Sequence, residues 1–509
     1  MKPISTRIII ALIAVCFLLT LASLFSCTWV TSDDYCIAMP TFNATDSFAY
    51  LKYLREGGNG TIAFFDRSTT EPQSIGIVNL FWAGTGFAGK MLSLSPISTY
   101  TALKILTPLL IMAVIYWTAG FFEVEKRKRL IILLLGFAFC GSHILMTIFG
   151  DSLTRMIGLN TTGVFFPFPI ASQIPHLGVA GVLATLSLLL FYRWSISKHA
   201  RDIVLSGITG TFLLQFQPYL FLLLVLVVIF WMLMTRKNHN FGDAISTSLL
   251  LMSFCVPVGY LGLIIILDPF TAERYKANIT QTGSLWVDLL GFILPLILVS
   301  IAYKRTKENP LGKFILLWFA LAFILAHLDF IPTNIRFYQG IGIPFSVMAV
   351  LGILQIWDYL KTKHSNLRGL FIAAAWILFY APLGVFVFVN IGIKPSYVMP
   401  KDILEISAEL QKEPRGIFLA PSVEAYLLYA DTDQMPYVAH WGETLYAEQK
   451  NIFRNDFYSG KFNDRGIISV LQEKNINYVV MPIASKADRT GLEKTFSTKN
   501  FEFYHVPKR

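Results

Sequence analysis

The stretch Asp46-Ser-Phe-Ala-Tyr-Leu-Lys-Tyr-Leu-Arg-Glu-Gly57 is polar, acidic and aromatic, and it follows closely on the first apolar run of the chain. It begins a long polar segment that continues through Asp66, Glu71 and Pro72. Most of the remaining chain passes from one apolar run to the next. On a helix, Asp46 and Tyr50 would share a face, because they are spaced i, i+4. Polar chemistry is therefore expected in this stretch, next to a first span.

The composition is that of a membrane protein. Hydrophobic residues make up 54% of the 509 residues and charged residues only 15%, whereas a soluble globular protein has about 25% charged residues. Together with many long apolar runs, this predicts an α-helical polytopic membrane protein whose partner is the lipid bilayer. The net charge of +10 does not indicate nucleic-acid binding, because the basic residues lie in short loops between apolar runs, where they orient a membrane protein.

We expect about eleven transmembrane helices, placed by apolar runs of about 17–25 residues. The predicted spans are 8–30, 97–122, 130–150, 177–193, 203–217, 219–235, 244–267, 286–303, 314–330, 340–358 and 369–392. The first run is longer than the core of a cleaved signal peptide, about 7–15 residues, so we expect it to be retained. The apolar run 75–92 is interrupted by glycines and Lys90. It is interpreted as an interfacial or re-entrant helix in the first outer loop, 31–96.

Basic residues in the short loops set the orientation, since positive loops stay in the cytoplasm. The cluster Lys126-Arg-Lys-Arg129 fits the cytoplasmic side. The short outer loops hold only Arg155, Arg274, Lys276 and Arg336. The amino terminus is therefore predicted to be cytoplasmic and the carboxy-terminal region extracytoplasmic.

Two domains are expected: a transmembrane domain of residues 1–392 and a small extracytoplasmic α/β domain of residues 393–509. In the second domain, short apolar runs at 416–420 and 476–481 predict strands, and the charged stretches around them predict helices.

The five cysteines are Cys16, Cys27, Cys36, Cys140 and Cys255. Four of them lie in predicted spans, where cysteine behaves as a small hydrophobic residue, and only Cys36 is expected outside the bilayer. Because no Cys-x-x-Cys pair occurs, neither a disulfide framework nor a zinc site is predicted.

Unusual polar residues gather at the predicted outer side, which suggests that they face a wet cavity. Asp46 is the leading catalytic candidate, as a general base or as a ligand to a divalent metal that binds substrate phosphate. Capping the first turn of a helix is the ordinary alternative for Asp46. Asp33 and Asp34 compete for the catalytic role, although solvation of a loop explains them equally well.

The order of motifs in 46–92 resembles the first outer loop of the GT-C membrane glycosyltransferases: an early Asp, a Tyr, an Arg-x-Gly, an aromatic-Asp, a Glu-Pro and an interfacial helix. These are polytopic enzymes that take a sugar from a polyprenyl-phosphate carrier, and the resemblance is closest to poorly characterised bacterial members. Asp46 falls where their catalytic Asp would be. Ser47 stands where better-known members often have a second acid, and Glu71-Pro72-Gln73 stands in place of their Lys-Pro-Pro.

The resemblance implies an inverting hexosyl- or pentosyltransferase that acts on an envelope glycan, lipid or protein. Its leaving group is a lipid phosphate, so fixed cations would stabilise the charge that develops there. Arg336 resembles the residue that holds the donor phosphate, and Lys104 and Arg274 are further candidates. Anchoring at the membrane interface is the alternative for Arg336 and Lys104. A divalent cation, Mg²⁺ or Mn²⁺, stays open as a cofactor.

Four other residues are predicted to bind substrate: Tyr50, Asp151, His176 and Gln217. His176 starts a span, where a hydrogen-bonded helix start is the alternative, and Gln217 precedes the Pro218 turn between two apolar halves. The stretch His440-Trp-Gly-Glu-Thr444 offers a Trp that suits sugar stacking, but we expect it to be a buried structural turn.

Two other functions stay open. One is a non-catalytic protein of the same fold that binds a lipid carrier or assists envelope polysaccharide assembly. The other is a transporter or flippase, which should show inverted repeats and Gly- or Pro-broken helices in both halves. Neither feature is evident in the sequence, so glycosyl transfer is the favoured function.

Overall fold

The computed structural model divides the chain into two compact units. One comprises residues 1–23, 101–262 and 279–393, and the other comprises 24–100, 263–278 and 394–509. We call them the helical unit and the mixed unit. The residues described are 5–21, 24, 27, 31–37, 44–123, 125–139, 166–172, 174–277, 285–306, 309–331, 333–364, 367–371, 374, 398–440, 444–462 and 466–508. The predicted site residue Asp151 lies outside them.

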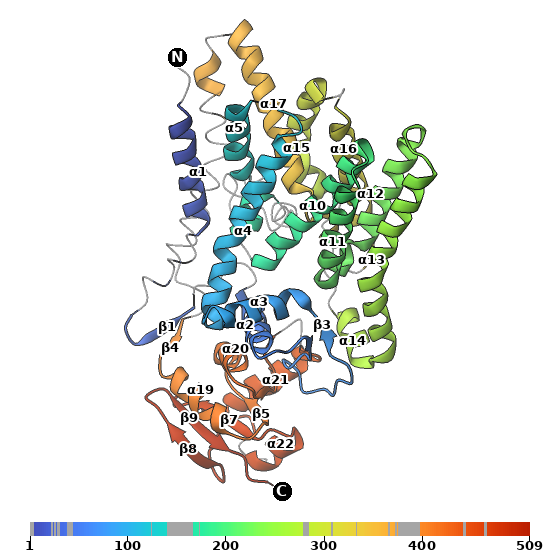
Figure 1. Cartoon of the computed structure of the whole chain (residues 1–509). Coiled ribbons are helices and arrows are strands. Elements are labelled where there is room, and N and C mark those ends of the chain that lie inside the picture. Colours follow the sequence, from blue (N-terminus) through green and yellow to red (C-terminus); the bar gives the residue numbers. More distant parts are fainter. Residues whose placement is uncertain are drawn as a thin grey trace. The chain divides into compact units, whose positions relative to one another are not determined.

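The helical unit consists of α-helices and short 3₁₀ turns (Figure 1). Its elements, two of which continue into the mixed unit, are α1 (Thr6–Thr20), α4 (Pro96–Ala119), α5 (Lys126–Phe137), α9 (Pro167–Ser172), α10 (Pro175–Ser197), α11 (Ala200–Phe216), η2 (Pro218–Leu220), α12 (Phe221–Met234), η3 (Arg236–Asn238), α13 (Phe241–Leu267), α15 (Leu285–Thr306), α16 (Pro310–Ala326), η4 (Asn334–Tyr338) and α17 (Gly342–Lys363). Their order follows the alternation of apolar runs and polar turns in the sequence.

Four helices in the described residues, α4, α10, α13 and α17, are long and apolar enough to cross a membrane. Shorter apolar helices lie at Thr6–Thr20, Pro218–Met234, Gly291–Tyr303 and Pro310–Ala326. The class of helical membrane protein is thus confirmed, whereas the number of eleven spans stays a prediction. Predicted span 369–392 and the end of 130–150 fall mostly outside the described residues.

The helices differ in how much of their surface other helices cover. In its most apolar window, α10 is 89% buried, whereas α13 is 22% buried. Buried hydroxyls along α10 are bonded to backbone: Thr185 Oγ1 donates to the Gly340 carbonyl at 3.0 Å, and Ser187 Oγ donates to the Ser206 carbonyl at 3.0 Å. Such bonds satisfy polar groups away from water. Helix α10 is therefore a central helix of this unit, and the exposed apolar surface of α13 suits contact with lipid.

The mixed unit combines short helices with three small sheets. Its elements are β1 (Asp34–Cys36), α2 (Ala44–Gly58), β2 (Ala63–Phe64), β3 (Ile77–Val78), α3 (Leu80–Met91), α14 (Pro269–Ala277), β4 (Val398–Pro400), α19 (Ile403–Lys412), β5 (Ile417–Leu419), α20 (Ser422–Asp431), β6 (Met435–Pro436), α21 (Ala447–Tyr458), α22 (Ile467–Glu473), β7 (Tyr478–Pro482), β8 (Glu493–Ser497) and β9 (Phe501–His505).

The largest sheet has the strand order β6-β5-β7-β9-β8. Strand β5 is parallel to β6 and β7, and β9 is antiparallel to β7 and β8. The register places Val479 opposite Tyr504, and both side chains enter a core with Phe457 and Leu471 of the covering helices. The predicted strands at 416–420 and 476–481 are found as β5 and β7. The boundary between domains at residues 392 and 393 stays a prediction.

The polar segment after the first helix is tied to the carboxy-terminal part of the chain. Strand β1 pairs antiparallel with β4, with Tyr35 opposite Met399. Cys36, at the end of β1, forms a disulfide with Cys27. The prediction that no disulfide occurs is therefore wrong. The reason is that α1 ends at Thr20, whereas the predicted span ran to residue 30 and placed Cys27 in the membrane.

The interrupted apolar run of the first outer loop, residues 75–92, contains helix α3. With 12 residues it is about 18 Å long, too short for a hydrocarbon core of about 30 Å. One face, with Phe81, Trp82 and Gly86, is buried, while Phe87 and Met91 are exposed. The two faces account for the mixed apolar and glycine pattern of the sequence.

The close packing of α2 and α3 depends on glycine. A Cβ on Gly86 would lie 2.8 Å from the amide nitrogen of Gly58 and closer still to the carbonyl oxygen of Leu54. Tyr50 stacks on Trp82 with ring centroids 4.7 Å apart. Helix α2 is therefore held on this side by backbone contact and aromatic stacking.

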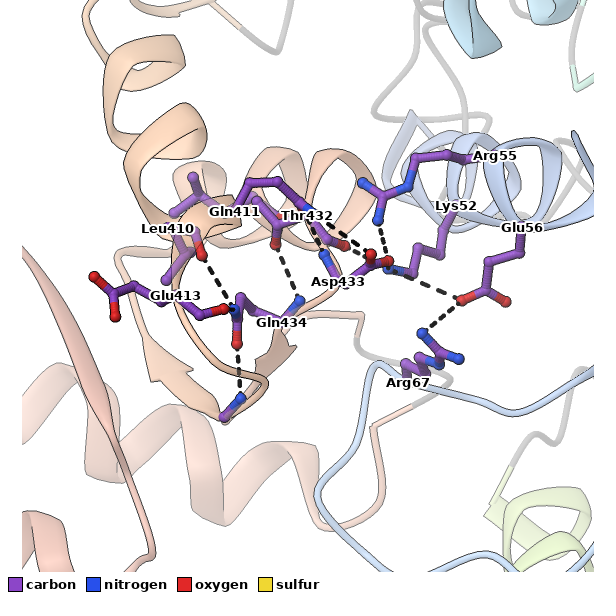
Figure 2. Close-up of polar contacts among 12 residues, drawn as sticks. Lys52, Arg55, Glu56, Arg67, Leu410, Gln411, Glu413, Thr432, Asp433 and Gln434 are labelled. Carbon is purple, nitrogen blue, oxygen red and sulfur yellow. Dashed lines mark hydrogen bonds and ion pairs between the residues drawn. The ribbon is translucent and has the colours of Figure 1, made fainter. Parts of the chain in front are cut away.

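A charge network with a buried lysine at its centre joins α2 to residues 432–434 (Figure 2). Lys52 is 1% exposed, and its Nζ donates to the carbonyl of Thr432 and lies 3.8 Å from Asp433 Oδ1. Arg55 pairs with the same carboxylate. Glu56 Oε1 lies 3.9 Å from Lys52 Nζ and 3.2 Å from Arg67 Nη1. The positive charges of α2 thus find acceptors from the other end of the chain.

Gln434 fixes the same segment from its other side (Figure 2). Its side-chain Nε2 donates to the carbonyls of Leu410 and Glu413 at 3.1 and 2.9 Å. Its Oε1 accepts the amide of Gly416 at 2.7 Å. Gln434 thereby holds Thr432 and Asp433, the partners of α2, against α19 and the start of β5.

Adding a methyl group at Gly86 should force α2 and α3 apart. We expect Gly86→Ala to destabilise the protein by about 1–3 kcal/mol, as overpacking of a close contact does. Gly84→Ala on the same helix is the matched control, because a Cβ there meets nothing within 4 Å. Thermal unfolding of the purified protein measures both. Equal unfolding temperatures for the two variants would contradict the close approach.

The stability of wild type should depend on pH, between about 7 and 10.5, in a way that the stability of Lys52→Met does not. Burial, with a smaller contribution from Arg55, lowers the pKa of Lys52 from its ordinary value of 10.5 to about 7. Below pH 7 both folded and unfolded chains hold the proton, and the full cost of burying the charge applies. Between pH 7 and 10.5 only the unfolded chain holds it, so the stability of wild type rises with pH.

We therefore expect the unfolding temperature of Lys52→Met, relative to wild type, to fall as the pH is raised from about 7 to about 9.5. The control is Lys461→Met, because Lys461 is largely exposed beside Asp456. Its difference from wild type should not change with pH. A pH-independent difference for Lys52→Met would show that the buried amine does not titrate in this range.

Candidate functional site

Asp46 lies in the first turn of α2 and pairs with a histidine from the far end of the chain. His440 Nε2 is 2.7 Å from Asp46 Oδ1, and the N–H donates to the carboxylate. The side chain of His440 is 7% exposed and that of Asp46 is 22% exposed. Among the described residues, no hydrogen bond or ion pair reaches the other carboxylate oxygen, Oδ2. The carboxylate is thus fixed at one oxygen and partly open at the other.

The first turn of a helix also favours a negative charge, because the backbone N–H groups point outward there. This electrostatic role of Asp46 is compatible with the pair, since the helix and His440 act on the same carboxylate. The neighbouring Ser47 is fully buried, and its Oγ lies 2.8 Å from the hydroxyl of Tyr100. Ser47 therefore serves packing and does not supply a second acid.

Asp33 and Asp34, the rivals of Asp46, take part in local contacts around β1. Asp34 Oδ2 accepts a hydrogen bond from Thr31 Oγ1 at 2.8 Å. The carbonyl of Asp33 accepts the amide of Lys401 at 2.8 Å, and its exposed carboxylate lies 3.6 Å from Lys499 Nζ. These contacts give both residues a part in holding β1 and the start of α19.

Arg274 on α14, predicted to bind phosphate, lies in an ion pair. Its Nε is 3.4 Å from Asp66 Oδ2, while Asp66 Oδ1 accepts from the amide and hydroxyl of Ser68 at 3.0 and 2.6 Å. Asp268, just before α14, accepts from Ser74 Oγ at 2.8 Å. The loop 66–74 is therefore fastened to α14 at both ends.

The same loop is also fastened to the stretch 444–450. Thr444 Oγ1 donates to the carbonyl of Ser68 at 2.6 Å, and the Leu445 amide donates to Thr69 Oγ1 at 3.2 Å. Lys450 Nζ lies 2.7 Å from Glu71 Oε1. Burial lowers the pKa of Lys450, against the effect of Glu71. The Glu-Pro motif of the sequence thus has a structural partner in α21.

The predicted basic residues of the helical unit lie on elements that are tied together. Lys104 on α4 is 4% exposed, and His176 at the start of α10 is 7% exposed. Gln339, one residue past η4, donates to the carbonyl of Leu177 at 3.0 Å. This bond brings η4, which carries Arg336, to the start of α10, where His176 lies. We call His176 and Arg336, on these two joined elements, the polar cluster.

Two contacts extend this cluster. A Cβ on Gly178, two residues after His176, would collide with the methyl group of Thr107 on α4, three residues after Lys104. Gln217 caps the end of α11 and is buried, and the η2 turn that follows it packs against η4. Gly340, with φ of +90°, makes the tight turn between η4 and α17 that a side chain would strain.

In the described part of the chain, no group of three or more His, Cys, Asp and Glu side chains is placed to hold a metal ion. Asp46 and His440 offer two such donors, fewer than the three protein ligands of typical catalytic zinc sites. A divalent cation stays a prediction from the resemblance.

Sequence reasoning did not assign His440 to the site. It singled out the stretch 440–444 but expected a structural turn. The partner of His440 is 394 residues away in the sequence, and no local pattern connects two such positions. The signal that the sequence offered for this contact was the polar character of the two stretches, 46–57 and 440–444.

Neither a scan of protein-family models nor a search of curated protein sequences gives a match. Solved structures do match. ArnT from Cupriavidus metallidurans bound to undecaprenyl phosphate aligns with 99% of this chain and 98% of its own, at 11% identity and a TM-score of 0.56. The Archaeoglobus fulgidus oligosaccharyltransferase in complex with Zn and sulfate aligns with 93% of this chain and 68% of its own, at 13% identity and a TM-score of 0.55.

Arabinofuranosyltransferase AftD from Mycobacteria aligns with 100% of this chain, which covers 42% of AftD, at 12% identity and a TM-score of 0.55. All three proteins are similar to this chain along most of its length. This chain therefore has the fold of the GT-C membrane glycosyltransferases, as the order of motifs in 46–92 indicated.

Proposed function

We propose that this chain is an inverting membrane glycosyltransferase that moves a sugar from a polyprenyl-phosphate donor to an envelope acceptor. The observation that carries the proposal is the carboxylate of Asp46, held at Oδ1 by His440 and open at Oδ2, in a chain of GT-C fold. The similar ArnT structure is bound to undecaprenyl phosphate, which supports a donor of the same chemical class. Whether the sugar is a hexose or a pentose is left to the assay.

In this mechanism, a hydroxyl or amine of the acceptor attacks the anomeric carbon of the donor sugar. Asp46 Oδ2 takes the proton of the attacking group, as a general base. The bond between the anomeric carbon and the phosphate oxygen breaks, and its electron pair stays on the lipid phosphate. Attack from the side opposite to the leaving group inverts the anomeric configuration.

The donor phosphate is assigned to the basic cluster of the helical unit. Arg336 would bind phosphate oxygens through its planar guanidinium, with His176 as a neighbouring donor. Lys104 and Gln217 are proposed to complete the polar surroundings, and Tyr50 is proposed to line the acceptor side. Arg274 is a weaker candidate, because Asp66 already neutralises its charge.

We place the reaction at the outer face of a bacterial plasma membrane. The disulfide between Cys27 and Cys36 supports this, because disulfides persist in oxidising compartments such as the periplasm. Residues 1–392 would form the membrane domain and residues 393–509 the extracytoplasmic domain. Helix α3, with one face buried and the other apolar and exposed, would lie in the membrane interface.

Asp46→Asn should lower kcat by at least about 100-fold, because the amide cannot accept the proton of the acceptor. The assay measures transfer of radiolabelled sugar from polyprenyl phosphate, and the unfolding temperature checks the fold. Asp33→Asn and Asp34→Asn are measured in parallel. Full activity of Asp46→Asn would contradict the assignment of the base. A loss of this size in Asp33→Asn or Asp34→Asn, with Asp46→Asn unaffected, would assign the base to that residue instead.

Arg336→Ala should raise the KM for the donor by about 10-fold or more, because a charge-assisted hydrogen bond to phosphate is lost. The KM for the acceptor should change much less. Arg201→Ala is the control, since Arg201 is an exposed cation at the start of α11. An unchanged donor KM and kcat for Arg336→Ala would show that the phosphate is bound elsewhere.

A further inference from the structure

The strongest unassigned contact in the mixed unit is the one between His440 and Asp46. It joins the first helix after the membrane anchor to a turn that follows β6 near the other end of the chain, and both side chains are largely buried. At 2.7 Å it has the length of a charge-assisted hydrogen bond. Since a carboxylate only accepts, the Nε2–H of His440 is the donor.

The turn that carries His440 is held independently of Asp46. The amide of Thr444 donates to the carbonyl of His440 at 2.8 Å. Thr444 Oγ1 in turn donates to the carbonyl of Ser68 at 2.6 Å. The imidazole therefore approaches Asp46 from a fixed backbone, and the pair needs no further ordering when substrate binds.

A second link joins α2 to the carboxy-terminal region without His440. Arg55, on the same helix, pairs with Asp433, and Lys52 donates to Thr432. These contacts involve residues of α2 that lie beyond the first turn. His440, in contrast, contacts the carboxylate in the first turn of α2, that of Asp46, which has an oxygen left open.

We infer that His440 is the positioning residue for the base Asp46, so that the carboxy-terminal region supplies part of the catalytic machinery. This inference rests on the proposed function. His440 keeps its Nε2–H throughout and directs Oδ2 of Asp46 at the acceptor. The proton moves from the acceptor to Oδ2, the new bond forms at the anomeric carbon, and the electron pair of the broken bond goes to the lipid phosphate.

The test compares four single variants of the full-length protein in the radiolabelled transfer assay, and then Asp46→Asn with and without His440→Leu. His440→Leu removes the donor. His440→Gln places an amide N–H near the former Nε2, and His440→Asn carries the same group on a chain that is too short to reach. Arg55→Gln is the control for docking, because it breaks a contact between α2 and the carboxy-terminal region without touching Asp46.

We expect kcat to fall by about 10- to 100-fold in His440→Leu and His440→Asn, as expected for loss of a hydrogen bond to a charged group. The KM for the donor should stay within about 3-fold of wild type, because the phosphate contacts are intact. His440→Gln should recover most of kcat, and Arg55→Gln should retain it. Adding His440→Leu to Asp46→Asn should cause little further loss, because the two residues act as a unit.

Three results would overturn the inference: equal kcat in His440→Leu and Arg55→Gln, equal kcat in His440→Gln and His440→Asn, or independent losses in the double variant. If His440→Leu does not fold, the comparison of kcat between His440→Gln and His440→Asn still decides whether His440 positions Asp46. A wild-type protein that transfers no sugar from any polyprenyl-phosphate donor offered is a different result, because it would overturn the proposed function itself.

Discussion

The mixed unit depends on charged groups of α2 that are satisfied by residues from the other end of the chain. Lys52, Arg55 and Asp46 each find a partner beyond residue 430. Burying a charge without a partner costs several kcal/mol, so this helix and the carboxy-terminal region stabilise each other. The base proposed for catalysis thus lies in the same framework that gives the unit its fold.

The proposed phosphate ligands and the proposed base lie on elements from different parts of the chain. The basic cluster of the helical unit is formed where η4 meets the start of α10, and the bond from Gln339 to the Leu177 carbonyl holds that junction. The carboxylate belongs to a helix that is surrounded by aromatic and glycine contacts, such as Tyr50 on Trp82 and Gly86 on Gly58. The proposed base and the proposed phosphate ligands thus lie on packed elements, which suits a reaction in which charge develops on the leaving group.

The sequence was sufficient for the features that composition and local pattern determine. Long apolar runs predicted α10 and α13, glycines and Lys90 marked the short helix α3, and apolar runs near 417 and 478 predicted β5 and β7. Contacts between distant segments could not be predicted. The pairing of β1 with β4 and the link from His440 to Asp46 join positions whose residue types are common and whose separation follows no period. The disulfide of Cys27 and Cys36 was missed for a different reason, because the predicted first span ran past the end of α1.

The most direct test is to supply radiolabelled polyprenyl-phosphate sugars to membranes with and without this protein and to determine the structure of the labelled product. We predict a new glycosidic bond, formed only when the protein is present, with an anomeric configuration opposite to that of the donor. The absence of any labelled product across hexose and pentose donors, or a product that retains the donor configuration, would contradict an inverting glycosyltransferase.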